Sequence, residues 1–121
     1  MIRIAACLSL LAALLVAGVA PSRATDMMTG SEIKAMVAGN TVTGAMVESG
    51  NYTEFYQADG IIKGDGYTGL WTVSDDSMCF QYGSDPQKCL QVGTIGDQIQ
   101  WFKGRRVDGT GMLVLGNPNN Y

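Results

Sequence analysis

Three side chains that could act together in chemistry occupy alternate positions of one predicted strand: Tyr52, Glu54 and Tyr56. Successive side chains of a strand point to opposite faces, so these three share one face. If that face lined a cavity, the Glu54 carboxylate could anchor a polar group of a ligand. Acidic side chains are mostly exposed in folded proteins, however, and we expect this face to point to solvent. The three residues are candidate contacts for a ligand or a partner.

The chain contains no histidine, which excludes whole classes of enzyme. Catalytic centres that pair serine or cysteine with histidine cannot form, and ordinary zinc sites are excluded as well. A pair of carboxylates could still hydrolyse a glycosidic bond. The adjacent acids Asp75 and Asp76 lie in a predicted turn, which does not suit such a pair. We therefore expect a protein that is not an enzyme, with no catalytic residue, metal ligand or cofactor.

The segment from Gly64 to Gly69 matches the G-x-G-x-x-G pattern of dinucleotide-binding loops. That chemistry needs a helix directly after the glycines, whose N-terminus meets the pyrophosphate. Here Leu70 to Val73 follows, and these residues predict a strand. We interpret the segment as a glycine-rich hairpin connection that helps the sheet to coil.

Positive charge gathers at one predicted turn, which contains Lys103, Arg105 and Arg106. Arg105 and Arg106 are candidate partner contacts, and the alternative is a solvated hairpin tip. The whole chain has a formal net charge of −3 with scattered acids. Because phosphate binding needs a basic stripe, we do not expect a nucleic acid partner.

Residues 1–24 predict a cleaved secretory signal peptide. Arg3 precedes an apolar run from Ile4 to Ala20, and Ser22-Arg23-Ala24 fits a small-x-small cleavage site. An uncleaved N-terminal anchor is the alternative, but the run is short for a membrane span, which needs about 20 apolar residues. We expect a periplasmic or secreted protein without stable membrane insertion, consisting of one domain over residues 25–121.

Removing the leader removes Cys7 and leaves two cysteines, Cys79 and Cys89. An even count in an exported protein predicts a disulfide bond, with a pair of free thiols as the alternative. If the two face each other across a hairpin, Met78 faces Leu90 and the apolar side chains share the inward face.

A short helix is predicted near the N-terminus of the domain. Thr29 and Glu32 have the spacing of a capping box, and Gly39 provides a left-handed stop. Ile33, Met36 and Val37 fall on one helix face. Because two or three turns are not stable alone in water, we expect this face to cover the open end of a sheet or barrel.

The rest of the chain predicts short strands separated by turn residues, spaced as in an all-β meander. Such strands could close into a small antiparallel β-barrel of about eight strands, which removes exposed edges. A two-sheet β-sandwich is the alternative. The predicted strands cover residues 41–48, 51–57, 61–64, 69–73, 77–82, 88–94, 98–103 and 109–115.

Several features together resemble a group of small exported alphaproteobacterial proteins of unknown function. The features are Gly39-Asn40-Thr41 at the helix end, Asp59-Gly60, Gly69-x-Trp71, Met78-Cys79 and the second cysteine, Cys89. The resemblance covers most of the chain after residue 24. It implies a periplasmic location, a compact β fold and a cysteine pair, and it implies no activity.

Two functions fit these observations. One is a non-catalytic, inhibitor-like interaction module of the cell envelope that presents its loops to another envelope protein. The other is a carrier that holds a small apolar ligand in a barrel cavity. Seven aromatic residues could line that cavity, or could simply fill a barrel this small. They are Tyr52, Phe55, Tyr56, Trp71, Phe80, Trp101 and Phe102.

Overall fold

The computed structural model of the chain describes residues 17–19 and 24–121. The predicted signal peptide, residues 1–24, falls almost entirely outside these residues, and its cleavage stays a prediction. No helix in the described part is long and apolar enough to cross a membrane. The elements are β1 (Asp26–Met27), α1 (Gly30–Val37), β2 (Asn40–Met46), β3 (Gly50–Tyr56), β4 (Ile61–Gly64), β5 (Tyr67–Ser74), β6 (Ser77–Gln81), β7 (Lys88–Ile95), β8 (Gln98–Lys103) and β9 (Arg106–Val114).

Strands β2 to β9 form a closed antiparallel barrel in which each strand pairs with its neighbour in sequence. Pairing of β2 with β9 closes the ring, with Thr41 opposite Val114 and Met46 opposite Gly109. The predicted all-β barrel of about eight strands is therefore confirmed, and the β-sandwich alternative is not found. The two-residue strand β1 was not predicted, and it adds to β7 outside the ring.

The predicted boundaries differ from the structure most at β9, which begins at Arg106 instead of residue 109, and next at the glycine-rich segment. Strand β5 begins at Tyr67, so only Asp65 and Gly66 connect it to β4. Gly66 has a φ of 78°, which suits a tight two-residue hairpin. The segment is thus a hairpin connection, although shorter than the glycine pattern suggested.

The disulfide between Cys79 and Cys89 is present and joins β6 to β7. The predicted register is confirmed as well, because Met78 pairs with Leu90 and Phe80 with Lys88. The bond closes a loop with a sequence separation of 10 residues. By the loop-entropy relation such a closure contributes about 3 kcal/mol to the free energy of unfolding.

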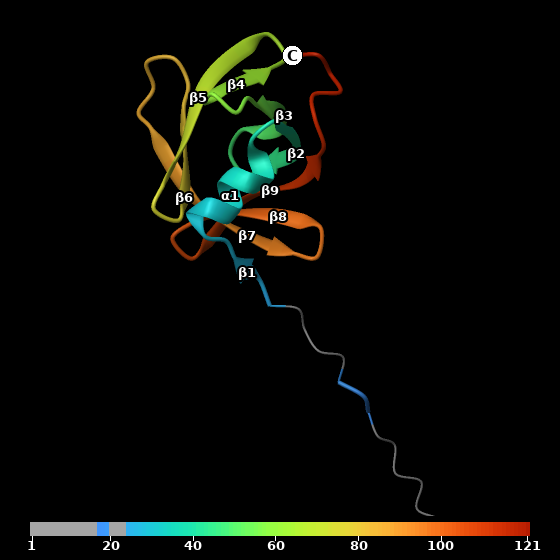
Figure 1. Cartoon of the computed structure of the whole chain (residues 1–121). Helices are drawn as coiled ribbons and strands as arrows, with labels where there is room; N and C mark the ends of the chain where they lie inside the picture. Colours follow the sequence, from blue (N-terminus) through green and yellow to red (C-terminus); the bar gives the residue numbers. More distant parts are fainter. Residues whose placement is uncertain (1–16, 20–23) are drawn as a thin grey trace, which may run out of the picture.

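Helix α1 begins as its sequence predicts. The Thr29 hydroxyl accepts a hydrogen bond from the backbone N–H of Glu32, and Gly39 takes a φ of 78° after the last turn. Ile33 and Val37 have no exposed surface. The helix packs against β2, β5 and β6 and lies across one mouth of the barrel (Figure 1). We call this mouth the helix end and the opposite mouth the open end.

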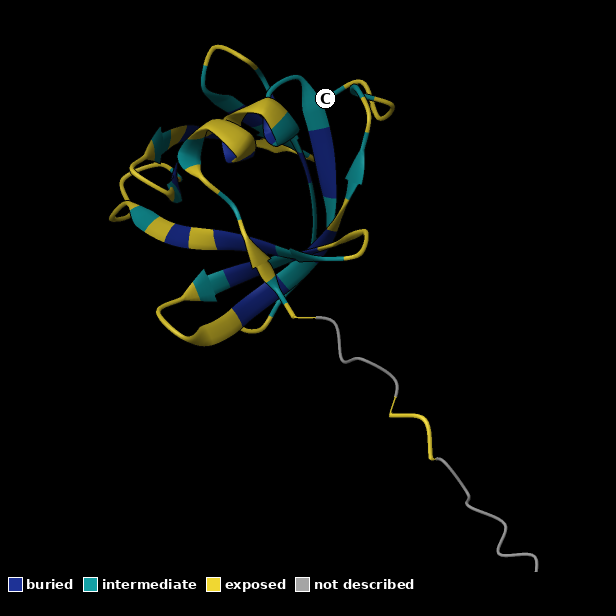
Figure 2. Cartoon of the chain, turned by 60° about the horizontal axis from the view of Figure 1, so that its bottom comes forward, coloured by how far each residue is buried: buried dark blue, intermediate teal, exposed yellow. Residues whose placement is uncertain are grey.

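Burial follows the alternation of the strand most clearly in β5, where buried and exposed residues change along the ribbon (Figure 2). The helix end is filled with aliphatic side chains and methionine. Its fully buried members are Ile33, Val37, Val42, Ile62, Met78 and Val92. Large aromatic side chains lie further along the barrel, toward the open end.

Candidate ligand-binding site

The strands alternate in direction, so their turns alternate between the two ends of the barrel. The open end carries the connections at residues 47–49, 65–66, 82–87 and 104–105. A pocket of about 530 Å³ lies there, with Ser49, Asp85 and Pro86 at its exposed rim. Six aromatic residues form much of its wall: Tyr52, Tyr56, Tyr67, Phe80, Tyr82 and Trp101.

Glu54 lies in the wall of this pocket and is only 6% exposed. The expectation that its strand face points to solvent is therefore wrong. Tyr52, Glu54 and Tyr56 do share one face, as the alternation predicted, but in a closed barrel that face is the interior. A lone strand pattern does not distinguish the two cases, because the surrounding strands decide which face is enclosed.

Three phenol groups donate hydrogen bonds to the Glu54 carboxylate. The hydroxyl of Tyr67 donates to Oε1 at 2.8 Å, and that of Tyr56 to Oε2 at 2.9 Å. Tyr82 lies between the two oxygens, at 2.9 Å from each. Three O–H protons thus meet a carboxylate that has about four acceptor sites, and Tyr82 shares its proton between the two oxygens. We call Glu54 with Tyr56, Tyr67 and Tyr82 the carboxylate cluster.

The cluster bridges a gap in the barrel wall. Strand β3 pairs with β2 at seven positions, but with β4 only at Phe55 and Tyr56. The stretch of β3 that carries Glu54 therefore has no backbone partner on the β4 side. Hydrogen bonds from Tyr67 and Tyr82 cross to Glu54 at this place. Side-chain hydrogen bonds therefore replace the backbone hydrogen bonds that are missing between β3 and β4.

Glycines make room for the rings of the cluster. A Cβ on Gly64 would lie 2.2 Å from the Tyr67 ring, and one on Gly69 would lie 2.7 Å from the Tyr82 ring. Both distances are far below normal van der Waals contact, so any larger residue would displace the ring. The G-x-G-x-x-G segment thus positions two of the phenols that donate to Glu54, and it leads into a strand instead of a helix.

Tyr52 connects strand β3 to residues of β8 and β9 through hydrogen bonds. Its hydroxyl accepts a hydrogen bond from the Trp101 indole N–H at 2.8 Å and donates to the Thr110 carbonyl at 2.9 Å. Burial, together with the negative charge of Glu54, raises the pKa of Tyr52 to about 12 against the lowering effect of the Trp101 hydrogen bond. The phenol therefore stays neutral and acts as a fixed polar bridge.

The phenols of the carboxylate cluster are held in the neutral form too. Burial, followed by the charge of Glu54 and the hydrogen bond to it, raises the pKa of Tyr82 and of Tyr56 well above the ordinary tyrosine range. Burial and the hydrogen bond to Glu54 also raise the pKa of Tyr67. Each phenol remains a hydrogen-bond donor at neutral pH.

Lys88 lines the same pocket, and its charge is already paired. Its ammonium contacts Asp108, which is 3% exposed and also contacts Arg106. The hydrogen bond from Lys88 lowers the pKa of Asp108, so this acid remains ionised. A β-bulge in β9, between Val107 and Gly109, turns Asp108 inward. Lys88 pairs with Phe80 between β6 and β7, and the charge of Asp108 balances the ammonium that Lys88 brings to this apolar position.

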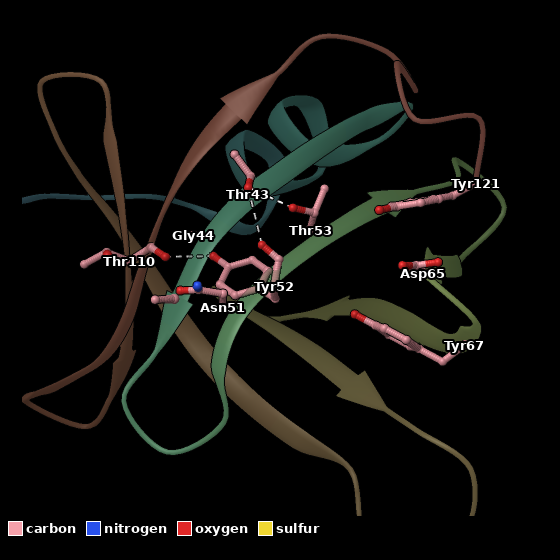
Figure 3. Close-up of a pocket in the computed structure, with 10 residues that line it drawn as sticks. Thr43, Gly44, Asn51, Tyr52, Thr53, Asp65, Tyr67, Thr110 and Tyr121 are labelled. Carbon is pink, nitrogen blue, oxygen red and sulfur yellow. Dashed lines mark hydrogen bonds between the residues drawn. The ribbon is translucent and has the colours of Figure 1, made fainter.

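A second, wider groove lies outside the gap in the barrel wall (Figure 3). Thr43 and Thr53 lie on one side of it, and Asp65, Tyr67 and Tyr121 lie on the other. Half of its lining residues have short polar side chains, and three are tyrosines. The inner pocket suits a ligand better, because aromatic walls with few polar groups release more water on binding.

The structure brings Tyr52, Glu54 and Tyr56 together at the pocket. Arg105 and Arg106 do not line it: Arg105 is exposed at the turn, and Arg106 pairs with Asp108. Tyr67 and Tyr82 were missed as partners of Glu54, because they come from other strands. Gly64 and Gly69 were the sequence signal that could have pointed to these rings, since a glycine in a strand often marks a place where another group approaches closely.

The aromatic residues named from the sequence divide between two roles. Tyr52, Tyr56, Phe80 and Trp101 line the pocket, whereas Trp71 is buried outside its lining and donates its indole N–H to the Gln57 carbonyl. Phe55 and Phe102 are half-buried and do not line the pocket.

Within residues 17–19 and 24–121, no group of three or more acidic, cysteine or histidine side chains could hold a metal ion. Comparison of the chain with protein families, curated proteins and solved structures finds no match. Function must therefore be argued from the pocket itself.

Proposed function

We propose that this protein is a non-catalytic carrier that holds a small ligand in the pocket at the open end of the barrel. The observation that carries the proposal is the contrast between the two mouths. One is filled by α1, whereas the other keeps a pocket of about 530 Å³ lined by aromatic rings and a buried carboxylate. This volume falls within the range of about 300–1,000 Å³ that small-molecule sites occupy.

The polar groups of the pocket support binding rather than catalysis. Glu54 already accepts four hydrogen-bond contacts, and the ammonium of Lys88 is paired with Asp108. A general base or nucleophile needs a free lone pair within reach of a substrate. Fixed groups of this kind instead orient a bound molecule.

A location in the cell envelope is part of the proposal. The Cys79–Cys89 disulfide fits an oxidising compartment. The predicted leader and the resemblance to small exported proteins point to the same place. In that compartment a small carrier would meet solutes and lipid headgroups.

An interaction module is the second candidate function. Two connections at the open end, residues 82–87 and 104–105, are mostly exposed and surround the pocket mouth. A partner protein could insert one side chain between them, in the manner of an inhibitor complex. A specific envelope protein recovered with the wild type, and lost when Arg105 and Pro86 are changed, would favour this candidate.

The two tryptophans provide the test of the carrier function. The Trp101 indole lies in the pocket wall, and the Trp71 indole does not. Titration with a fragment library of small neutral and charged molecules, followed by NMR of the two indole N–H signals, should shift Trp101 and leave Trp71 unchanged. A library in which no molecule shifts Trp101, or in which both signals move equally, would overturn the proposal.

A further inference from the structure

We infer that the ligand of this pocket carries a quaternary ammonium group, that is, a fully alkylated nitrogen with a permanent positive charge. The inference rests on the proposed carrier function and names the chemical class of its ligand. It comes from three independent features: the charge of the pocket, the hydrogen bonds of Glu54 and the arrangement of the rings.

The pocket has a negative charge that no side chain compensates. Both ion pairs found within residues 24–121 involve Asp108, and neither reaches Glu54. Asp85 at the rim adds a second acid. An uncompensated buried carboxylate is costly, and a cation placed beside it offsets that cost. The negative charge of Glu54 therefore favours a ligand that carries a cation.

The hydrogen bonds of Glu54 select among cations. Its two oxygens already accept the O–H protons of Tyr56, Tyr67 and Tyr82, so at most one acceptor site remains for an incoming N–H. A primary ammonium must replace about three hydrogen bonds to water when it is buried. A quaternary ammonium has none to replace, and the charge of Glu54 still attracts it.

The rings form walls that suit an alkylated cation. Tyr67 meets Tyr82 at 64°, Tyr56 meets Phe80 at 65°, and Phe80 meets Trp101 at 83°. These rings pack edge to face, so their faces point in different directions along the wall of the pocket. Aromatic walls bind quaternary ammonium through cation–π attraction, which is strongest where water is excluded.

The same pocket disfavours an anionic ligand. Its lining carries two acids, Glu54 and Asp85, against one cation, Lys88, whose ammonium already contacts Asp108. A carboxylate or phosphate in the pocket would meet Glu54 without a free counter-charge. The contacts therefore distinguish between ligands of opposite charge as well as between kinds of amine.

Choline and its uncharged isostere dimethylbutanol, in which carbon replaces the ammonium nitrogen, are the matched probes. Isothermal titration of the folded, disulfide-bonded protein should give a dissociation constant about tenfold lower for choline, the order that cation–π attraction supplies. Glu54→Gln should remove this preference. Asp97→Asn, in an exposed turn at the helix end, is the matched control and should retain it.

Binding of dimethylbutanol to Glu54→Gln shows that the variant is folded, and the comparison of probes on the wild type needs no variant. Equal affinity for both probes, with Trp101 shifted, would refute the ammonium inference and leave the carrier function standing. If neither probe binds while neutral fragments shift the Trp101 signal, the ammonium inference is likewise refuted and the carrier function stands. If nothing shifts Trp101, the carrier function fails as well.

A quaternary ammonium could come from a free solute or from a lipid headgroup. Sedimentation with phosphatidylcholine vesicles, compared with phosphatidylglycerol vesicles, distinguishes these sources. Co-sedimentation with phosphatidylcholine alone supports a headgroup, whereas binding of choline without co-sedimentation supports a solute. Equal sedimentation with both vesicles would contradict recognition of the ammonium.

Discussion

At the helix end, Ile33 and Val37 enter the barrel and leave no exposed surface, whereas at the open end a carboxylate and six aromatic side chains surround a pocket. The same eight strands form both ends of the barrel, so the strands do not explain the difference. It arises from what each end receives: an amphipathic helix at one, and rings packed over glycines at the other. The comparison teaches that stability and binding are carried by separate residues.

The largest expected effect is on stability at the helix end. Ile33→Ala removes a side chain with 0% exposure and should lower the free energy of unfolding by about 3 kcal/mol, as large-to-small core substitutions do. Urea unfolding measures this loss. The preference for choline over dimethylbutanol should not change, and a lost preference in the folded variant would show that the two ends are coupled.

A matched pair of glycine variants tests the open end. Gly69→Ala places a Cβ against the Tyr82 ring and should push the ring away from Glu54. We expect a loss of about 2 kcal/mol in stability and a weaker choline complex. Gly66→Ala strains a residue with a φ of 78° by about 1–2 kcal/mol but touches no ring.

The two glycine variants should therefore lose similar stability, and only Gly69→Ala should lose choline affinity. Isothermal titration of both variants provides the measurement. If choline affinity falls equally in the two, the position of the Tyr82 ring is not what matters for binding.

Alkaline pH should weaken the open end selectively, by a smaller amount for each phenol. The pKa of Tyr52 is raised from 10.0 to about 12, so its contribution to stability is complete below about pH 10 and is lost as the pH rises toward 12. Between pH 10 and pH 11 this loss is about 1 kcal/mol. Tyr56, Tyr67 and Tyr82 add to it in the same direction.

Urea unfolding at about pH 8 and at about pH 11 measures this dependence. Ile33→Ala should show the same difference between the two pH values as the wild type, and Tyr82→Phe a smaller one. Unchanged stability of the wild type across this range would contradict the burial of these phenols.

The helix end could be read from the sequence, because its signals are local. The Thr29 cap, the Ile33 and Val37 stripe and the Gly39 stop lie within eleven residues, and the structure confirms each of them. The cysteine register was equally local, since one pairing fixed the neighbouring positions of β6 and β7.

The site at the open end could be predicted only in part, because its contacts connect distant strands. Glu54 was singled out, but its exposure was predicted wrongly, since a single strand does not show which face a barrel encloses. Tyr82 lies 28 residues from Glu54, and no local pattern relates them. Asp108 was overlooked because the bulge that turns it inward is a tertiary feature.

The most direct test of the pocket is a crystal structure of the disulfide-bonded protein grown with choline. The account predicts a trimethylammonium group in the open end, within about 6 Å of the Tyr82 and Trp101 rings, with the hydrogen bonds to Glu54 intact. A pocket closed by the side chains of Tyr67 and Tyr82, or choline bound only at the outer groove, would contradict it.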